Sequence, residues 1–119
     1  MMATAVAQGK YIGVAPRKAR LVADQIRGKT VAEARDVLHY TVKLAAPLLS
    51  KVLESAVANA ESAAAERRER IDTDEMIVRS VQIDGGPVTR RYRPQPRGRA
   101  TRIRKRTSHI SIMITDETT

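Results

Sequence analysis

The sequence has no cysteine, no phenylalanine and no tryptophan, and its 119 residues include only three tyrosines and two histidines. Without cysteine the chain can form no disulfide, no thiolate metal site and no cysteine nucleophile. The two histidines, His39 and His109, are too few for the common metal centres, so we expect neither a metal site nor any cofactor. A core without large aromatic side chains must be built from valine, isoleucine, leucine and alanine. A platform of aromatic side chains that stacks single-stranded bases is not expected.

Long apolar runs and catalytic patterns are also missing. No stretch approaches the roughly 20 apolar residues that a membrane span requires, and the first residues lack the charged start and apolar centre of a secretory signal. We therefore expect a cytoplasmic protein with no membrane partner. Neither histidine has a nucleophile or an acid at a catalytic spacing, and there is no nucleophile elbow or phosphate-binding glycine loop. These absences predict a protein that is not an enzyme and has no small-molecule substrate.

Positive charge is abundant, and it is concentrated in one segment. The formal net charge is +9, and residues 90–106 (RRYRPQPRGRATRIRKR) hold nine of the 22 lysines and arginines and no acid. The other 13 basic residues balance the 13 acidic ones. Nine like charges in one segment repel one another, so we expect a partner that neutralises them. Guanidinium groups bind phosphate through forked hydrogen bonds, so the functional interpretation is that this segment binds the phosphate backbone of RNA, although the charge alone indicates a polyanion and not which one. The alternative is a solvated loop with no ligand.

Three helices are predicted in the first half of the chain. Residues 16–28 begin with proline and end with glycine, as the ends of a helix favour. A capping box at 30–33 predicts a second helix that ends near Tyr40. A third should begin within 41–47, continue to about Ala65 and lie at the centre of the core. The apolar faces comprise Ala19, Val22, Ala23 and Ile26 in the first helix, Val31, Ala34 and Leu38 in the second, and Leu48, Leu49, Val52, Leu53, Ala56, Val57 and Ala60 in the third.

The second half of the chain changes to the alternating pattern of strands. Val81 and Ile83 alternate with polar residues, and so do the isoleucines of 110–114. Residues 6–14 are a candidate third strand. The basic segment lies between the two later strands, so antiparallel pairing would make residues 85–107 a hairpin that projects roughly 30 Å. Its tip should be turned or kinked by Pro94, Pro96 and Gly98.

A second basic surface is possible on the first helix. Arg17, Arg20 and Arg27 lie opposite its apolar face, around Asp24, and Lys10, Lys18 and Lys29 are near in sequence. This face is either a second contact surface for RNA or an ordinary solvated helix face, and the sequence leaves both readings open. His109, at the start of the last strand, is expected on its polar face, where it would contact RNA.

Four segments together resemble the bacterial-type large-subunit ribosomal protein twenty-two family. They are PRKARLVADQIRGK (16–29), LESAVANAE (53–61), GRA (98–100) and KRTSHI (105–110), in the order of the family and at compatible separations. The resemblance implies an α+β fold in which three helices pack on a small three-stranded antiparallel sheet, with a long basic β-hairpin protruding from it. It implies a single domain over 1–119, with a globular part at about 1–84 and 108–119.

The resemblance also implies a function and its partners. The chain would be a structural constituent of the large ribosomal subunit that binds 23S ribosomal RNA, assists assembly of the subunit and is ribosome-bound. Its hairpin would line the polypeptide exit tunnel, with the nascent polypeptide and ribosomal protein four as neighbours. Two departures from the family concern the path of the hairpin: Gly85 stands where an acidic residue is usual, and Pro96 adds a second proline to the tip.

The charge pattern and the resemblance together give the expected site residues. Those expected to bind RNA are Lys10, Arg17, Lys18, Arg20, Lys29, Arg90, Arg91, Arg93, Arg97, Arg99, Arg102, Arg104, Lys105, Arg106 and His109. Those expected at the tip in the tunnel are Arg91, Tyr92, Arg93, Pro94, Gln95, Pro96, Arg97 and Gly98. The competing classes are a DNA-binding or architectural protein, a small hydrolase or nuclease, and a binder of anionic lipid surfaces, which would need an apolar amphipathic face.

Overall fold

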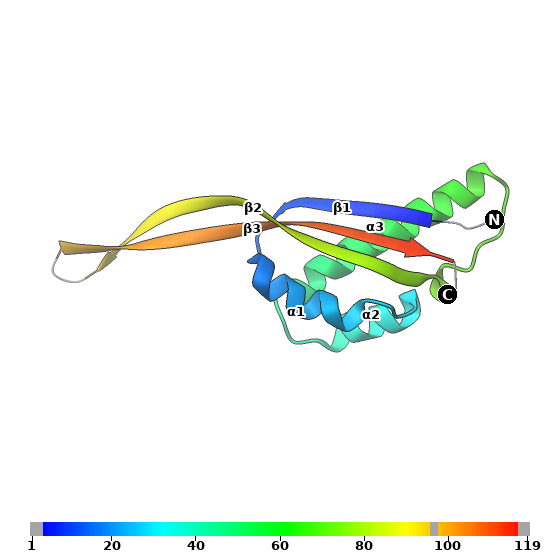
Figure 1. Cartoon of the computed structure of the whole chain (residues 1–119), viewed down its shortest axis with the longest axis horizontal. Coiled ribbons are helices and arrows are strands. Elements are labelled where there is room, and N and C mark those ends of the chain that lie inside the picture. The colour runs from blue at the N-terminus through cyan, green and yellow to red at the C-terminus, as the bar shows by residue number, and fades with distance from the viewer. Residues whose placement is uncertain (1–3, 96–97, 117–119) are drawn as a thin grey trace.

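A computed structural model describes residues 4–95 and 98–116, with the side chains of all of these except 89–95 and 99–105. Three helices, one short 3₁₀ turn and three strands follow one another along the chain (Figure 1). In order they are β1 (Thr4–Ile12), α1 (Pro16–Ile26), α2 (Val31–Tyr40), α3 (Ala45–Glu66), η1 (Thr73–Glu75), β2 (Ile77–Gln95) and β3 (Arg99–Thr115). This confirms the predicted α+β class, and all three helices end within two residues of the predicted bounds.

The three strands form one antiparallel sheet in the order β1-β3-β2. The central strand β3 pairs with β1 from Thr4 opposite Thr115, and with β2 along almost its whole length. The isoleucines of β3 therefore lie in the middle of the sheet, where branched side chains pack well on a pleated surface. The candidate strand at 6–14 is confirmed as β1, although it begins and ends two residues earlier than predicted.

The helix ends follow local chemistry. Pro16 occupies the first turn of α1, and Gly28, just beyond its end, has a left-handed φ of +83° that glycine adopts without strain. At the start of α2 the backbone N–H of Glu33 donates to the Thr30 hydroxyl over 3.3 Å, which is the threonine half of the predicted capping box. These signals explain both ends of α1 and the start of α2.

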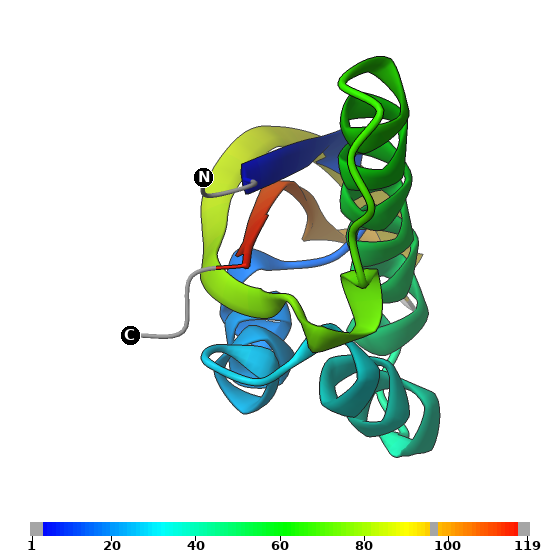
Figure 2. The same ribbon diagram turned by 90° about the vertical axis from the view of Figure 1, so that its right-hand side faces the viewer.

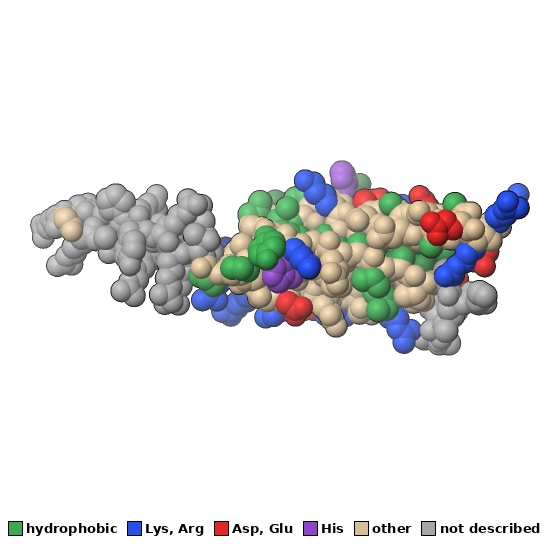
Figure 3. Space-filling view, turned by 90° about the horizontal axis from the view of Figure 1, so that it is seen from above, with side chains coloured by type: hydrophobic (Ala, Val, Ile, Leu, Met, Phe, Trp, Pro, Cys, Tyr) green, Lys and Arg blue, Asp and Glu red, His purple; other side chains and the backbone are tan. Residues whose placement is uncertain are grey.

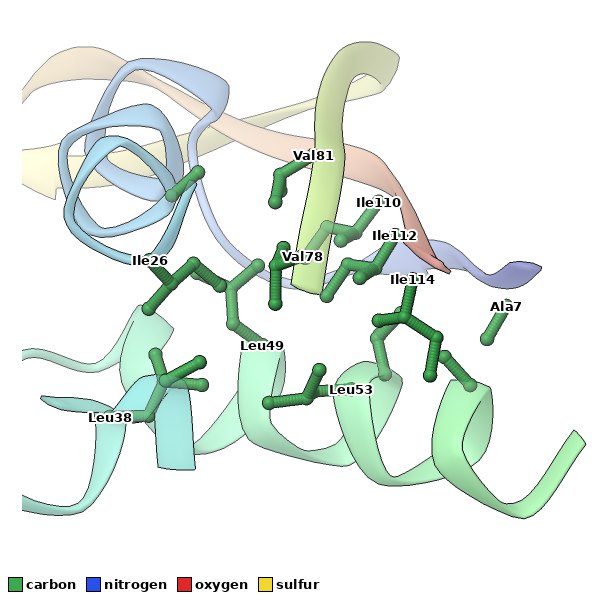
Figure 4. Packing of buried hydrophobic residues seen from close by; sticks show 14 of the residues in the cluster. Ala7, Ile26, Leu38, Leu49, Leu53, Val78, Val81, Ile110, Ile112 and Ile114 are labelled. Atoms are coloured by element: carbon green, nitrogen blue, oxygen red, sulfur yellow. The ribbon is translucent and has the colours of Figure 1, made fainter. Parts of the chain in front are cut away.

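The core lies between one face of the sheet and the helices. α3 packs against β1 and β3, α1 against β2, and α2 against α3 (Figure 2). Figure 4 shows the isoleucines of β3 pointing towards Leu49 and Leu53 of α3, which are both completely buried. Each such side chain stabilises the fold by about 1.5–3 kcal/mol. The other face of the sheet has no helix over it, as the exposed Thr4 and Gln8 of β1 show.

The strands β2 and β3 continue beyond the helices as a long two-stranded ribbon (Figure 1). The molecule measures 66 × 26 × 20 Å along its principal axes. Pro94 lies within the ladder opposite Ala100, and Gly98 has a left-handed φ of +71°, as expected of a turn residue. Pro96, the third residue predicted to shape the tip, lies outside the described residues. None of the described helices is long and apolar enough to cross a membrane.

Candidate nucleic-acid interface

The candidate interface is the part of the β2–β3 ladder that projects beyond the helices. Residues 88–95 of β2 pair with residues 99–106 of β3, and this register places Arg90 directly opposite Arg104. Like charges in such a pair destabilise a ladder by roughly 0.2–1 kcal/mol. No acidic residue occurs anywhere in 85–115. The sequence of the ribbon therefore provides no carboxylate that could offset its positive charge.

A bulge at the base of the ribbon decides on which face each position lies. Ile110 of β3 faces the helices, and alternate positions along a strand share a face. On β3, Arg106 lies four residues closer to the tip than Ile110, so it lies on the same face, where it is exposed. Position 104 follows on this face. The pairing of β2 with β3 shifts within 85–88, which brings Arg90 to the same face. The face that is apolar beneath the helices is therefore basic where the helices end.

Two hydroxyl groups fix the direction in which the ribbon leaves the sheet. The buried Ser108 donates its hydroxyl hydrogen to the backbone oxygen of Val14 over 2.5 Å, which links β3 to the turn before α1. Thr107 donates to the backbone oxygen of Pro87 over 2.8 Å. A side chain at Gly86 would place its Cβ only 2.4 Å from the Thr107 hydroxyl oxygen, so glycine allows this close approach. Sequence reasoning missed these roles, although both hydroxyls lie in the KRTSHI segment that carried the resemblance.

The arginines of α1 turn out to be tied to the sheet. Arg20 donates to the backbone oxygen of Ile83 over 2.9 Å, and Arg27 donates to that of Val81 over 2.6 Å and pairs with Asp24 at 2.5 Å. These carbonyl groups belong to β2, an edge strand, where unpaired backbone groups invite unwanted pairing with other chains. The α1 face is therefore neither of the two predicted alternatives alone, because part of its charge covers a strand edge.

The first turn of α1 lies near the base of the ribbon, and the far end of α1 does not. Pro16 is the nearest group to the Cβ position of Gly85, at 4.0 Å, and the exposed Arg17 and Lys18 follow it directly. Lys29 instead follows the other end of α1, where its backbone oxygen accepts from the N–H of Val78. The structure therefore brings Arg17 and Lys18 close to the ribbon and places Lys29 about 20 Å along β2 from it.

Lys10 and His109 meet on the open face of the sheet at the base of the ribbon. The pairing of β1 with β3 is irregular between Gly9 and Ile12, and within this bulge Tyr11 has a left-handed φ of +57°. The backbone N–H of Tyr11 donates to Nδ1 of His109 over 3.2 Å, so a neutral His109 carries its proton on Nε2. Lys10 is exposed beside this pair. Figure 3 shows basic side chains where the globular part meets the hairpin.

The remaining predicted residues are described only in part. For Arg90, Arg91, Tyr92, Arg93, Pro94, Gln95, Arg99, Arg102, Arg104 and Lys105 the structure describes the backbone, while Arg97 and Pro96 lie outside the described residues. The backbone of the others places them on the two paired strands in the register given above. Their role therefore stays a prediction from charge and from the resemblance.

The helical side of the molecule carries a different arrangement of charges. Arg35 of α2 donates to the two carboxylate oxygens of Glu54 over 2.6 and 3.1 Å and pairs with Asp74 at 2.6 Å. The hydrogen bonds to Glu54, with the charges of both carboxylates, raise the pKa of the Arg35 guanidinium above its ordinary value. A hollow of about 550 Å³ lies beside this network. In the described part of the chain no three His, Asp or Glu side chains are grouped as metal ligands.

The structure is that of a small α+β protein whose long two-stranded ribbon has a sequence rich in arginine and lysine and free of acid. Residues 7–115 match the family of ribosomal protein L22p/L17e, and the chain belongs to this family. Large ribosomal subunit protein uL22 of Rubrobacter xylanophilus is 51% identical over 108 residues, which cover 91% of this chain and 81% of the relative. Its counterpart in Leptospira biflexa is 44% identical over 115 residues, covering 97% and 95%.

Membership of this family confirms two predictions made from the sequence. The family consists of structural proteins of the large ribosomal subunit, so the resemblance carried by the four segments identified the correct family. It also consists of proteins that are not enzymes, which excludes the hydrolase or nuclease among the competing classes. The chain is therefore a structural component of the large subunit.

Proposed function

We propose that this chain binds 23S ribosomal RNA through its basic ribbon, holds segments of that RNA together during assembly, and lines the polypeptide exit tunnel with the ribbon tip. The main observation in support is the ladder of residues 88–95 and 99–106, which projects beyond the core and contains no acidic residue. As a single domain of residues 1–119, the protein would be ribosome-bound in the cytoplasm, with neighbouring large-subunit proteins as further partners.

The geometry of the ribbon suits a phosphate backbone. Basic positions on one face, such as Arg102, Arg104 and Arg106, recur every second residue, at about 6.6 Å. This spacing is of the same order as that of successive phosphates along an RNA strand. Because arginines stand at both odd and even positions of the two strands, the ribbon would be able to contact RNA on both sides at once. Each contact releases counterions from the RNA, which supplies the driving force for binding.

The same features indicate that the ribbon needs a partner in order to be stable. An isolated two-stranded hairpin is marginally stable in water, and the opposed Arg90 and Arg104 weaken it further. RNA would neutralise these charges and order the ribbon as it binds. The first turn of α1, with Arg17 and Lys18, and the pair of Lys10 and His109 would extend the contact onto the globular part.

The tunnel assignment rests on the length of the ribbon and on the family. A ribbon with about ten residues in each strand reaches roughly 30 Å from the body, far enough to cross a layer of RNA. Its tip, residues 91–98, would then face the nascent polypeptide and ribosomal protein four. Without a layer of RNA to cross, such an extension would only expose charge.

The test is the salt dependence of binding to 23S ribosomal RNA. Replacing Arg90 and Arg104 by glutamine should lower the slope of log K against log salt by about 1.5, since each lost phosphate contact contributes about 0.7–0.9. The matched control replaces Arg68 and Arg70, which are exposed beyond the end of α3, and should leave the slope unchanged. Equal effects of the two pairs would refute the ribbon as the binding element. Tighter binding to duplex DNA than to the ribosomal RNA would favour the architectural protein instead.

A further inference from the structure

A small hollow lies on the open face of the sheet, at the base of the ribbon. Its volume is about 220 Å³, and side chains of all three strands line it: Gln8 and Lys10 of β1, Asp84 of β2, and His109 and Ser111 of β3. Pockets for drug-sized ligands measure roughly 300–1,000 Å³, so this hollow suits a smaller group. In Figure 3 histidine, basic and acidic side chains lie together at the hairpin base.

The bulge in β1 shapes this hollow. It places two residues, Lys10 and Tyr11, opposite the single residue His109, and bulges of this kind re-aim side chains next to functional sites. Tyr11 holds a left-handed φ of +57°, which costs free energy in a residue other than glycine. Its N–H occupies Nδ1 of His109 and the two rings meet edge to face, 5.0 Å apart. The strained backbone therefore orients the histidine ring and leaves Nε2–H free to donate.

Asp84 is the unexpected member of this group. It is exposed and directly opposite His109 in the ladder, and none of the ion pairs or side-chain hydrogen bonds found among the described residues involves its carboxylate. Phosphate oxygens would repel its carboxylate, whereas the N–H groups of a base would donate to it. A carboxylate at the edge of a phosphate-binding surface is therefore a group to which the donors of a base edge can be matched.

We propose that this hollow binds one unpaired guanine of the ribosomal RNA, with Asp84 accepting from N1–H and the N2 amino group and Lys10 donating to O6. Guanine is the only common base whose Watson–Crick edge presents two adjacent donors, which match the two oxygens of one carboxylate. Single-stranded RNA is read by protein groups on this edge. The Nε2–H of His109 and the exposed ring of Tyr11 are placed to contact the ribose and phosphate of the same nucleotide.

This inference rests on the proposed binding of 23S ribosomal RNA, but it makes a claim of its own. Phosphate contacts carry no information on sequence, so the ribbon alone gives affinity without fixing which nucleotides it contacts. A guanine held at the base of the ribbon would fix which nucleotide lies beside β1 and so set the register of the ribbon along the RNA.

The test combines chemical probing with one substitution and a matched control. A dicarbonyl reagent that modifies N1 and N2 of guanine is applied to 23S ribosomal RNA with and without the protein. We expect one guanine to be protected by the wild-type chain, and Asp84→Asn to abolish that protection and weaken binding about tenfold. Asp36→Asn removes the same charge from exposed α2, on the helical side, and should change neither quantity. Replacing the protected guanine by inosine, which lacks the N2 amino group, should weaken wild-type binding but not binding by Asp84→Asn.

Three outcomes separate this inference from the proposed function. If Asp84→Asn binds as tightly as the wild type or more tightly, while the Arg90 and Arg104 variant is weakened, the guanine site is wrong and the ribbon proposal stands. The same holds if no guanine becomes protected in a complex that does form. If the wild-type chain does not bind the ribosomal RNA, both proposals fail. Circular dichroism of Asp84→Asn should match the wild type, because Asp84 is exposed and contributes nothing to the core.

Discussion

Ser108 is the residue whose replacement by alanine tests the geometry at the base of the ribbon most sharply. Its side chain is completely buried, and its hydroxyl donates to the backbone oxygen of Val14 over 2.5 Å. Alanine removes this donor, so the backbone oxygen of Val14 loses the hydrogen bond at a buried position that water does not reach. A buried polar group that loses its partner costs about 1–3 kcal/mol. We therefore expect Ser108→Ala to lower the free energy of unfolding by about 2 kcal/mol.

The assay is urea denaturation followed by circular dichroism at constant pH and salt. The midpoint should fall while the slope with denaturant stays the same, as expected when stability changes without a change in the exposed surface. For a chain of this length Tm should fall by roughly 8 °C. The matched control is Ser80→Ala on β2, where the serine is only half-buried and faces away from the core, and its effect should stay within about 0.5 kcal/mol. A Ser108→Ala protein as stable as this control would refute the assignment of the hydroxyl as the link between β3 and the turn before α1.

Three further predictions concern other parts of the fold, each measured by the same denaturation assay. Gly86→Ala should destabilise the ribbon base by about 1–3 kcal/mol and clearly less in a Thr107→Ala background, because the crowding hydroxyl is then absent; additive effects would contradict this. Arg35→Met should cost about 0.5–1 kcal/mol in low salt and less in high salt. Because the pKa of Arg35 is raised, this contribution should persist across the neutral pH range and disappear only in strongly alkaline solution. Leu53→Ala should cost about 2–5 kcal/mol, and a smaller loss would mean that α3 is not the centre of the core.

The elements that could be predicted from the sequence are those with a local signature. The first helix has proline at its start, glycine beyond its end and an apolar face, and it forms where this pattern places it. The third helix follows an apolar stripe, and Leu49 and Leu53 on this stripe are completely buried. Strand alternation at the isoleucines of β3 is equally local. Period and end signals depend only on neighbours within a few residues, which is why they can be read without the fold.

The features that could not be predicted depend on residues far apart in the chain. The pairing of Thr4 with Thr115 joins the two ends of the described chain and leaves no trace in the periodicity of either strand. Arg20 looked like part of a free basic face, yet it donates to a strand 63 residues further along. The bulge at Tyr11 creates the hollow beside His109, and only the register of β1 against β3 reveals it. Sites formed by residues from distant parts of the chain follow from tertiary structure. The sequence therefore indicated the charge of the interface, but not how the residues at the base of the ribbon are arranged.

The most direct test of the central claim is sedimentation of the tagged chain in a cell lysate, with the fractions washed in concentrated salt. Loose electrostatic binding falls steeply as salt is raised, so a superficial basic protein is removed by such a wash. A ribbon threaded between RNA segments should instead keep the chain with the large subunit at about one copy each, and the Arg90 and Arg104 variant should be retained less well. A chain that washes off completely, or that sediments with chromosomal DNA, would contradict the account.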